Sequence, residues 1–326
     1  MRVAIAGGSS PTLGSSIVSA LLATEGRYTP VILSRKSKTP REKESHTQHG
    51  EVETRCVDYQ SHASLVLALS DVAAVISVLL IPGPDWVTAQ VNLLHAAEAA
   101  GCQRFAPSEF ALTSWAHTMV DLLDVKNTVW NTVRASVDQG KIDAARFPCG
   151  MFMNYLGIGC PESKRTDALA GFQEGPFLVH LDSNPPWVEV PVQSDNTMPN
   201  ITMTDIRDIG KFIVAALDMK EPWGGRELGM AGDTLSFEKL INICQSYIGR
   251  PIEVRRVKED ELQARLSALP PDQVIPRMEC QLAIVCSRGG SVVPFTLKLS
   301  ASHPTTVGEY MRFYWSSDPM CGTSKV

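Results

Sequence analysis

The feature that most constrains the fold is the N-terminal succession of an apolar strand, a turn rich in glycine and serine, and a helix. Arg2–Ala6 (RVAIA) predicts a buried strand, and Leu13–Ala23 predicts a helix. The turn between them is G-G-S-S-P-T-L-G, from Gly7 to Gly14. Such a turn directs backbone N–H groups and the positive end of the helix dipole at one point, which attracts phosphate groups. We therefore expect a dinucleotide-binding loop that uses Gly8, Ser9, Ser10, Thr12, Leu13 and Gly14.

The centre of this turn departs from the usual G-x-x-G-x-x-G spacing. Gly8 permits the tight turn and Gly14 lets the helix pack closely, but Pro11 replaces the middle glycine. Proline has no backbone N–H, so the loop loses one donor. The serine and threonine hydroxyl groups and the amides of Thr12 and Leu13 can replace that donor, and we expect nucleotide binding to survive. The alternative is a turn that binds no ligand.

The second predicted strand ends at a basic residue. Pro30–Ser34 is followed by Arg35, Lys36 and Lys38, about twenty residues beyond Gly14, where an NAD site carries Asp or Glu for the ribose hydroxyls. A guanidinium group binds a 2′-phosphate through two hydrogen bonds and stacks on adenine. We therefore expect the cofactor to be NADPH, held by Arg35 and Lys36. The alternative is a solvated basic loop.

Short apolar runs alternate with amphipathic segments through the first half of the chain, which is typical of β-α units and a parallel sheet. The predicted strands are Arg2–Ala6, Pro30–Ser34, Glu53–Val57, Ala74–Val78, Arg104–Ala106 and Asp143–Phe147. The predicted helices are Leu13–Ala23, His62–Leu69, Trp86–Ala100 and Leu122–Asp138. We expect an α/β fold in which residues 1–150 form a doubly wound, NADP-binding Rossmann domain with six strands.

The alternation fades after about Gly150, where proline and glycine become frequent. We expect residues 151–326 to form mainly a smaller substrate-binding subdomain with long loops, some of whose elements pack back on the Rossmann domain. Two helices are predicted here. One is Asp205–Leu217, opened by Thr204, and the other is Phe237–Tyr247, opened by Ser236.

Composition limits the partners. A net charge of −5 argues against nucleic acid and anionic membranes, and no apolar stretch approaches the length of a membrane span. The eight cysteines never occur at C-x-x-C spacing, and the seven histidines are scattered. This pattern predicts reduced thiols and no metal site. We expect a cytoplasmic protein, a monomer or a homodimer, whose partner is a small molecule.

Several segments resemble the NmrA-like, isoflavone-reductase-like branch of the atypical short-chain dehydrogenases. The first four are the glycine-rich loop, Arg35, the segment R-F-A-P-S-E-F (Arg104–Phe110) followed by Lys126, and F-P-C-G-M-F-M-N-Y-L (Phe147–Leu156). Ile201–Phe212 and Pro304–Trp315 extend the resemblance to nearly the whole chain. The loop and the C-terminal half are similar to those of fungal members, many of which resemble tailoring enzymes of secondary metabolism.

The resemblance implies a catalytic lysine in the helix after P-S-E-F, which aligns with Lys126. It also implies that Lys126, Leu79 and Pro148 contact the cofactor. A partly desolvated lysine beside the nicotinamide would have a lowered pKa and could exchange a proton with a carbonyl, enol or phenol oxygen. The alternative is an exposed helix lysine. No Y-x-x-x-K occurs, so the Tyr-Lys pair of ordinary short-chain dehydrogenases is absent.

The resemblance further implies a substrate pocket over the nicotinamide. Its lining would be Phe110, Met151, Phe152 and Tyr155, which suit a flat, apolar, aromatic substrate, although each could instead be a core residue. His117 lies in the predicted loop between P-S-E-F and Lys126, where a second proton donor could reach the substrate. The alternative for His117 is a solvated loop histidine.

These features predict an NADPH-dependent reductase of an aromatic or polyketide-like molecule. Hydride would pass from C4 of the nicotinamide to a ketone, enone or benzylic carbon, and Lys126 would supply or relay the proton. Two alternatives stay open. One is a redox-neutral isomerase, dehydratase or cyclase on the same scaffold, and the other is a regulator that senses NADP without turnover.

Overall fold

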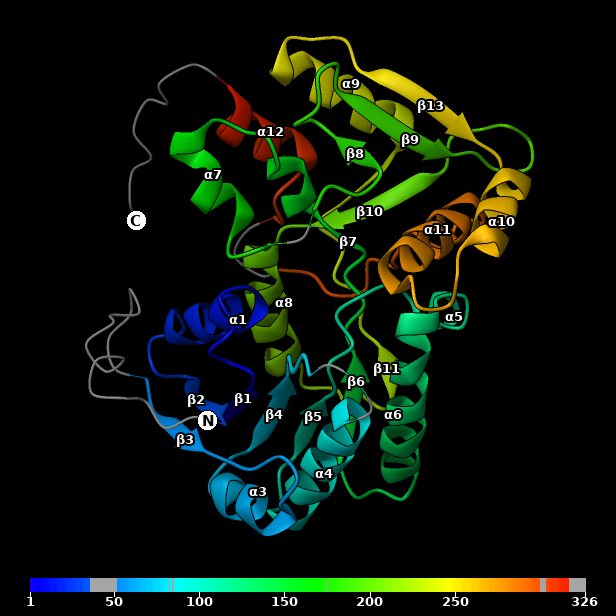
Figure 1. The fold of residues 1–326 in the computed structure, drawn as a ribbon. Helices are drawn as coiled ribbons and strands as arrows, with labels where there is room; N and C mark the ends of the chain where they lie inside the picture. The colour runs from blue at the N-terminus through cyan, green and yellow to red at the C-terminus, as the bar shows by residue number, and fades with distance from the viewer. Residues whose placement is uncertain (36–51, 82, 84, 174, 300–302, 317–326) are drawn as a thin grey trace. The chain divides into compact units, whose positions relative to one another are not determined.

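The chain folds into two compact units (Figure 1). The computed structural model describes residues 1–35, 52–81, 83, 85–173, 175–299 and 303–316. The first unit comprises Met1–Cys149, Ile206–Met230 and Val293–His303, and the second comprises Gly150–Asp205, Ala231–Val292 and the chain from Pro304 onward. Two segments from the second half of the sequence therefore belong to the first unit.

The first unit is built on a parallel sheet of seven strands in the order β11-β6-β5-β4-β1-β2-β3. The strands are β1 (Arg2–Ala6), β2 (Thr29–Ser34), β3 (Thr54–Cys56), β4 (Ala74–Ser77), β5 (Arg104–Ala106), β6 (Asp143–Arg146) and β11 (Arg226–Glu227). This is the doubly wound order with one strand added at the edge, so the expected Rossmann fold is confirmed. The order reverses between β1 and β4, and ligands of such sheets bind at the strand ends there.

The six strands expected from the sequence are present, each within one residue of its expected ends. The prediction of six strands was nevertheless one short. The seventh, β11, has two residues and comes from the second half of the chain, where it pairs through Arg226 with Ala145 of β6. Such a short element carries no periodicity that a sequence could reveal.

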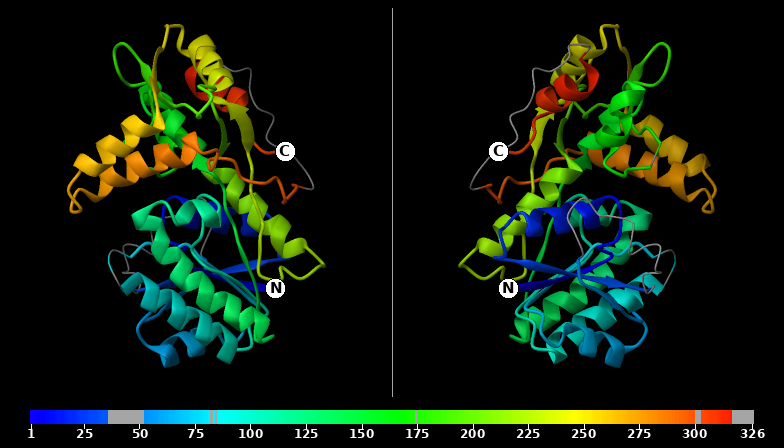
Figure 2. Two further views of the ribbon diagram at one scale, coloured as in Figure 1. Left: turned by 90° about the vertical axis from the view of Figure 1, so that its right-hand side faces the viewer. Right: turned by 90° about the vertical axis from the view of Figure 1, so that its left-hand side faces the viewer.

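Helices cover both faces of this sheet. They are α1 (Leu13–Leu22), α3 (His62–Leu69), α4 (Asp85–Ala99), α5 (Ser114–His117), α6 (Asp121–Asp138) and α8 (Ile206–Asp218). Helices α1 and α8 pack together on one side, and α3, α4 and α6 lie on the other (Figure 2). Because helices cover both faces, β1 and β4 are buried almost throughout, as their continuous apolar sequences predict.

Helix α8 approaches α1 closely because the residue of α8 that faces α1 is a glycine, Gly210. The Ser16 hydroxyl of α1 donates to the Ile206 carbonyl at 2.6 Å and accepts from the Gly210 amide at 3.1 Å. A Cβ atom at Gly210 would overlap the Ser16 carbonyl oxygen. Helix α8 begins at Ile206, so Thr204 does not open it as the sequence suggested. Thr204 ends a strand, and its hydroxyl accepts from the Gly232 amide at 3.0 Å.

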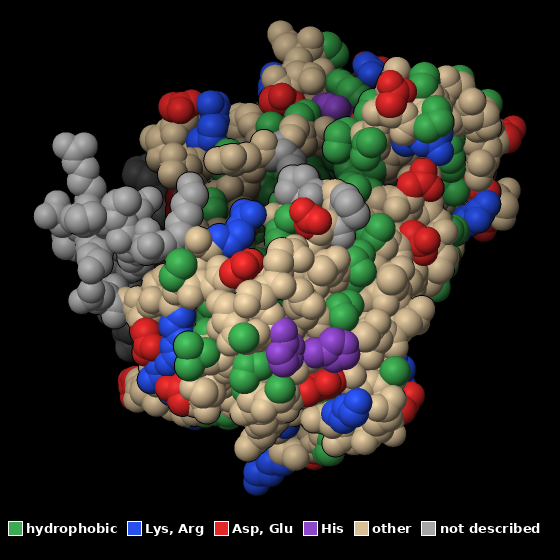
Figure 3. Space-filling view, turned by 60° about the horizontal axis from the view of Figure 1, so that its bottom comes forward, with side chains coloured by type: hydrophobic (Ala, Val, Ile, Leu, Met, Phe, Trp, Pro, Cys, Tyr) green, Lys and Arg blue, Asp and Glu red, His purple; other side chains and the backbone are tan. Residues whose placement is uncertain are grey.

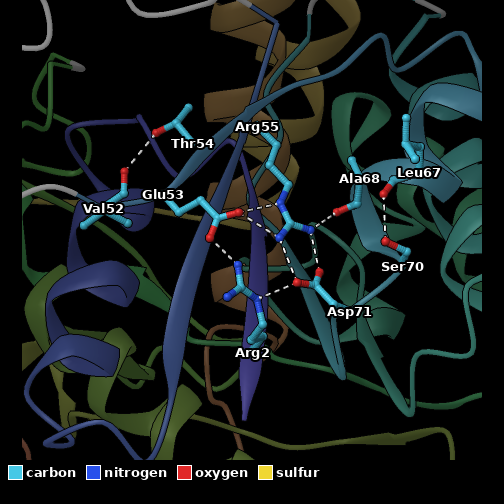
Figure 4. Close-up of polar contacts among 9 residues, drawn as sticks. All are labelled: Arg2, Val52, Glu53, Thr54, Arg55, Leu67, Ala68, Ser70 and Asp71. Carbon is cyan, nitrogen blue, oxygen red and sulfur yellow. Dashed lines mark hydrogen bonds and ion pairs between the residues drawn. The ribbon is translucent and has the colours of Figure 1, made fainter.

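Four charged side chains join the amino ends of the strands, at the edge opposite the β1–α1 turn (Figure 4). Arg55 contacts Asp71 at 2.6 Å and Glu53 at 2.7 Å. Arg2 contacts Asp71 at 3.1 Å and also pairs with Glu53. Hydrogen bonds from the arginines hold the pKa values of both carboxyl groups below their usual range. The network links edge strand β3 to central strand β1, and because it is partly exposed its contribution to stability is modest.

The described residues of the second unit form two small sheets and six helical segments. One sheet has the order β12-β10-β7 and the other β13-β9-β8. The strands are β7 (Met151–Phe152), β8 (Val179–His180), β9 (Trp187–Pro191), β10 (Asn200–Thr204), β12 (Asp233–Ser236) and β13 (Glu253–Val257). The helices are η1 (Met153–Gly157), α7 (Glu162–Leu169), α9 (Phe237–Ile248), α10 (Glu259–Ala268), α11 (Val274–Ser287) and α12 (Val307–Trp315). They enclose one apolar core.

The long loops expected in this half are therefore largely replaced by regular elements. Helix α9 and its cap were predicted correctly, since the Ser236 hydroxyl accepts from the Lys239 amide at 3.2 Å. The capping box of α12, in which Thr306 and Glu309 bond to each other's backbone amides, was a readable signal that the sequence analysis did not use. None of the helices in the described part of the chain has the length and apolarity needed to cross a membrane.

Replacing Gly210 by alanine should destabilise the first unit. The added methyl group must displace the α1 backbone, and overpacking of this kind costs about 1–3 kcal/mol. Urea unfolding followed by circular dichroism measures the change. Gly308→Ala is the matched control, because a Cβ there meets nothing within 4 Å and α12 should gain up to about 1 kcal/mol from the better helix former. Equal stability of Gly210→Ala and the wild type would contradict the packing argument.

Candidate functional site

The turn between β1 and α1 is held tightly by its own backbone. The Gly7 amide donates to the Leu33 carbonyl at 3.4 Å, and the Gly8 amide donates to the Ile5 carbonyl at 3.1 Å. Gly7 has φ +82°, in the left-handed region that favours glycine. A Cβ atom at Gly14 would lie 2.5 Å from the Gly7 carbonyl oxygen, so only glycine lets the start of α1 approach this closely. The sequence analysis identified Gly8 and Gly14 but missed Gly7.

Several amides of the turn remain available in spite of Pro11. Within the described residues, the amides of Ser9, Leu13 and Gly14 donate no hydrogen bond, as is usual for the first turn of a helix. The Ser10 and Thr12 hydroxyl groups lie 2.8 Å apart and are bonded to each other. The loop can therefore offer three amides to an anion, and Ser10 and Thr12 support the turn.

A cavity of about 620 Å³ opens beside this turn at the carboxyl ends of β1, β2 and β4. Its lining is Gly7, Ser9, Ser10, Pro11, Leu33, Ser34, Arg35, Tyr59 and the four residues from Val78 to Ile81. Ser9, Ser10, Arg35 and Leu79 were expected here. Gly8, Thr12, Leu13 and Gly14 lie in the turn, outside this lining. Lys36 and Lys38 lie outside the described residues.

The far end of the cavity combines a cation with a buried phenol. Arg35 follows β2, and its carbonyl accepts a weak bond from the Cys56 thiol at 3.7 Å. The Tyr59 hydroxyl donates to the Leu33 carbonyl at 3.1 Å, and burial raises the pKa of this phenol. Tyr59 therefore forms a neutral wall beside Arg35. Sequence reasoning missed Tyr59, which follows the short strand β3.

The segment after β4 links the cavity to Lys126. The Leu79 carbonyl accepts a hydrogen bond from the Trp86 indole at 2.9 Å. The Lys126 ammonium lies over the same indole, 5.1 Å from the ring centre. Trp86, which the sequence analysis placed only as a helix residue, thus connects a cavity residue to the candidate catalytic lysine.

Lys126 is half-buried on α6, and its ammonium donates to the Ser108 carbonyl of the P-S-E-F segment. Burial lowers the pKa of this lysine, and the nearby Arg146 acts in the same direction, while Glu109 raises it. A lysine in this environment gives up its proton more readily than an exposed one. Pro148, also expected at the cofactor, follows β6, and its carbonyl accepts from the Met230 amide at 2.8 Å.

A group of buried charges lies behind the lysine. His117 Nδ1 is 3.6 Å from Glu109 Oε2, and Arg146 Nε is 3.7 Å from the same oxygen. Burial raises the pKa of Glu109 to about 7, against the lowering effect of Lys126 and Arg146. Burial and the same two cations lower the pKa of His117 to about 3.

The structure corrects the expectation of a loop position and a solvated alternative for His117. This residue ends the short helix α5 and is 1% exposed. Four residues are too few for a helical periodicity to be read from the sequence. Glu109 was quoted in the P-S-E-F motif, but no role was predicted for it. An acidic residue three positions after the predicted strand Arg104–Ala106 was the available signal.

The residues expected to contact the substrate fall in both units. Phe110, in the first unit, is buried and stacks on Phe147 with 6.3 Å between ring centres. Met151, Phe152 and Tyr155 belong to the second unit, where Tyr155 meets the edge of Phe172 at 4.7 Å. Among the described residues no cluster of three or more histidine, cysteine or acidic side chains suits a metal ion.

Comparison with known proteins identifies the family. The model of the NmrA-like family matches residues 1–310, and the chain belongs to this family. Oxidoreductase BOA1 of Botryotinia fuckeliana is 29% identical over 254 residues, 76% of each chain. Isoflavone reductase homolog P3 of Arabidopsis thaliana is 24% identical over 267 residues, 79% of each chain.

Solved structures share the fold at low sequence identity. AtPrR2 with NADP+ and (+)pinoresinol has a TM-score of 0.68 and 19% identity, with 96% of this chain and 98% of that chain covered. The NADPH complex of the quinone oxidoreductase QOR2 from Escherichia coli has a TM-score of 0.65 and 19% identity, with coverage of 95% and 99%. These similarities support the Rossmann-like fold described above.

The raised pKa of Glu109 predicts a pH-dependent cost of folding. The carboxyl group binds its proton more tightly in the folded protein than in the unfolded chain, so the folded protein loses stability as pH rises from about 4.5 through 7. Glu109→Gln removes this cost. Between pH 5 and 8 the stability of the variant relative to wild type should therefore rise by roughly 2–3 kcal/mol.

Urea unfolding at the two pH values measures this difference. Glu238→Gln, at an exposed position on α9, is the control and should follow the wild type at both. A stability difference between Glu109→Gln and wild type that stays constant from pH 5 to 8 would show that Glu109 ionises normally in the folded protein.

Proposed function

We propose that this protein is an NADPH-dependent reductase of a small aromatic or polyketide-like molecule, with Lys126 as the proton donor. The observation that carries the proposal is the β1–α1 turn. Three of its amides have no acceptor among the described residues, and Arg35 is among the residues that line the cavity beside it. Neighbouring structures of the same fold are NADPH or NADP+ complexes, which supports this choice of cofactor.

The residues present fit the phosphate groups of NADPH. The amides of Ser9, Leu13 and Gly14, at the positive end of α1, suit a pyrophosphate. Arg35 suits the 2′-phosphate, and Leu79 with its neighbours provides an apolar wall. Pro11 removes one donor from this set but leaves the other three in place. Lys36, although outside the described residues, would add a second positive charge.

Lys126 supplies the acid–base chemistry. NADPH, when bound, supplies a hydride to the electrophilic carbon of the substrate. The oxygen of a ketone or enone then gains negative charge, and Lys126 Nζ gives it a proton and later regains one from solvent. Burial lowers the pKa of Lys126, which makes this transfer easier than from an exposed lysine.

Apolar and aromatic side chains favour an aromatic substrate. Phe110, Met151, Phe152 and Tyr155 would contact it, and His117 would act as a second polar group. The related fold of AtPrR2 was solved with (+)pinoresinol, and the relative BOA1 is an oxidoreductase of a fungus. A role in secondary metabolism is part of the proposal, and these likenesses support it. Six of the seven described cysteines are buried, which suits a reducing, cytoplasmic setting.

On the face drawn in Figure 3, the distribution of charged side chains does not favour a polyanionic partner. Acidic and basic side chains are interspersed there, without a large area of one sign. This mixture agrees with the net charge of −5 and supports a small-molecule partner.

Arg35→Asp should weaken NADPH binding. The change removes a charge-assisted contact with the 2′-phosphate and adds repulsion, so the affinity should fall by roughly 1.5–3 kcal/mol, or about 10- to 150-fold. NADH binding should change much less. Isothermal titration calorimetry measures both. Lys141→Asp, an equal charge change at an exposed site outside the cavity, is the control. Unchanged NADPH affinity in Arg35→Asp would exclude Arg35 from the site.

Lys126→Ala should abolish turnover and leave NADPH affinity within about threefold of wild type. Loss of a general acid typically costs 10²- to 10⁴-fold in rate. Lys126→Arg keeps the charge but does not release a proton, so it should be similarly inactive. Oxidation of NADPH with aromatic ketones, enones and quinones measures turnover. Full activity of both variants would remove Lys126 from the mechanism.

The same assay distinguishes the two alternatives. NADPH binding by the wild type without turnover of any tested compound would favour the nucleotide-sensing regulator. Conversion of a substrate without consumption of NADPH would favour the redox-neutral enzyme.

A further inference from the structure

A buried carboxylate beside Lys126 has no part in the reaction proposed above. Glu109 follows β5 in the P-S-E-F segment, His117 ends α5, and Arg146 ends β6. Their exposed fractions are 1%, 1% and 3%. Three elements therefore bring ionisable side chains together in the interior of the first unit.

Hydrogen bonding does not account for this burial. Within the described part of the chain, both carboxylate oxygens of Glu109 lack hydrogen-bond partners. Nε of Arg146 is likewise unsatisfied, and the approaches to Glu109 of 3.6 and 3.7 Å are longer than hydrogen bonds. Burying a carboxylate under these conditions costs several kcal/mol. The attraction of Lys126 and Arg146 offsets only part of this cost, because the net effect on the pKa of Glu109 is a rise.

Four elements contribute the ionisable side chains around Glu109. Lys126 on α6 and Arg146 on β6 are positive, Glu227 on β11 is negative, and His117 on α5 is neutral because its pKa is about 3. Glu227 is already engaged elsewhere, since its Oε1 accepts from the Ser114 amide at 2.9 Å and lies 3.7 Å from Arg146. The Lys126 ammonium donates to the carbonyl of Ser108, the residue before Glu109, so the chain itself brings the Glu109 carboxyl group near the lysine. Its negative charge acts on Lys126 in the direction that raises the lysine pKa.

Arg146 is fixed by contacts of its own. Its Nη2 donates to Asn127 Oδ1 at 3.1 Å, and its guanidinium lies over the Trp130 ring at 4.6 Å. Asn127 is the residue after Lys126 on α6. Arg146 therefore links Glu109 to the same helix turn that carries the lysine.

We propose that Glu109 is the internal counter-ion of Lys126, a positioning residue whose negative charge holds the proton on the lysine amine until the substrate takes it. His117 and Arg146 keep the carboxylate in place. The inference rests on the proposed function only where it concerns turnover, because the charge coupling exists without cofactor or substrate.

The two groups should titrate in a coupled manner. Burial lowers the pKa of Lys126, and the ionised Glu109 opposes this effect. The pKa of Glu109 is itself raised to about 7, so the carboxyl group becomes charged as pH rises through neutrality. Above pH 7 the lysine has its full counter-ion and holds its proton more tightly. Cys149, near Lys126, does not compete, because burial raises the pKa of its thiol to about 12.

The test is an NMR titration of protein labelled with ¹³Cε-lysine, in which Lys126→Arg assigns the Lys126 signal. Glu109→Gln should lower the pKa of Lys126 by roughly one unit or more, the size expected for loss of a partly buried opposite charge. Glu109→Asp keeps the charge and should largely restore the wild-type value. Asp124→Asn, which removes an exposed carboxylate two residues from Lys126, is the matched control and should shift the pKa by less than about 0.3 unit.

The wild-type protein provides a second readout that needs no variant. The Lys126 signal should show an additional inflection near pH 7, where Glu109 ionises. Absence of that inflection would overturn the proposal, as would equal Lys126 pKa values in wild type and Glu109→Gln.

Kinetics separate this inference from the proposed function. In Glu109→Gln the alkaline limb of kcat/KM should move to lower pH by the same amount as the NMR midpoint, with NADPH affinity unchanged. A uniform loss of kcat without a shift in the limb would indicate a merely structural role and overturn the proposal. If the NMR shift occurs while Lys126→Ala keeps full turnover, the counter-ion stands and the proposed reaction fails.

Discussion

The close approach of α1 to the end of β1 is the constraint on which the rest of this structure depends. Gly14 lies so near the Gly7 carbonyl that no side chain fits between them. The amides at the start of α1 are therefore directed at the carboxyl edge of the sheet, beside the point where the strand order reverses. Because donors, helix dipole and cavity coincide at this edge, the substitution of Pro11 for glycine removes one donor without removing the site.

Burial determines the chemistry of Lys126. The lysine lies among the Trp86 ring, the Ser108 carbonyl and the buried charges behind α6, where water screens charges poorly. A lysine in such a place loses its proton too readily unless a negative group faces it. Glu109 is that group in our account. The same burial that makes the lysine reactive thus makes its environment sensitive to a single carboxylate.

The sequence was sufficient for the first half of the fold because its signals are local. Every strand and helix predicted before Gly150 lies within one residue of its observed ends, since each shows an apolar period of its own. In the second unit, of the described elements this reasoning found helix α9 alone. Its strands have two to five residues, and partners such as Trp187 and Glu253 pair across long stretches of sequence. No local pattern encodes such pairing.

In the candidate site, too, residues with a local sequence signal were predicted, and residues whose roles depend on distant contacts were missed. Ser9, Arg35 and Leu79 were expected at the cavity from motif spacing or family resemblance, and they line it. Tyr59 and Trp86 were missed because their roles depend on contacts with residues distant in sequence. His117 was expected in a loop, but tertiary packing of the short α5 buries it. Burial of charge is a property of the assembled fold, so the sequence could single out Glu109 by its place after the strand but could not reveal that His117 and Arg146 lie beside it.

A crystal structure of the protein grown with saturating NADPH tests the central claim most directly. The account predicts the pyrophosphate within hydrogen-bonding distance of the amides of Ser9, Leu13 and Gly14, with the 2′-phosphate at Arg35. A nucleotide bound elsewhere, or a cavity that stays empty because Pro11 fills the position of the phosphates, would contradict it.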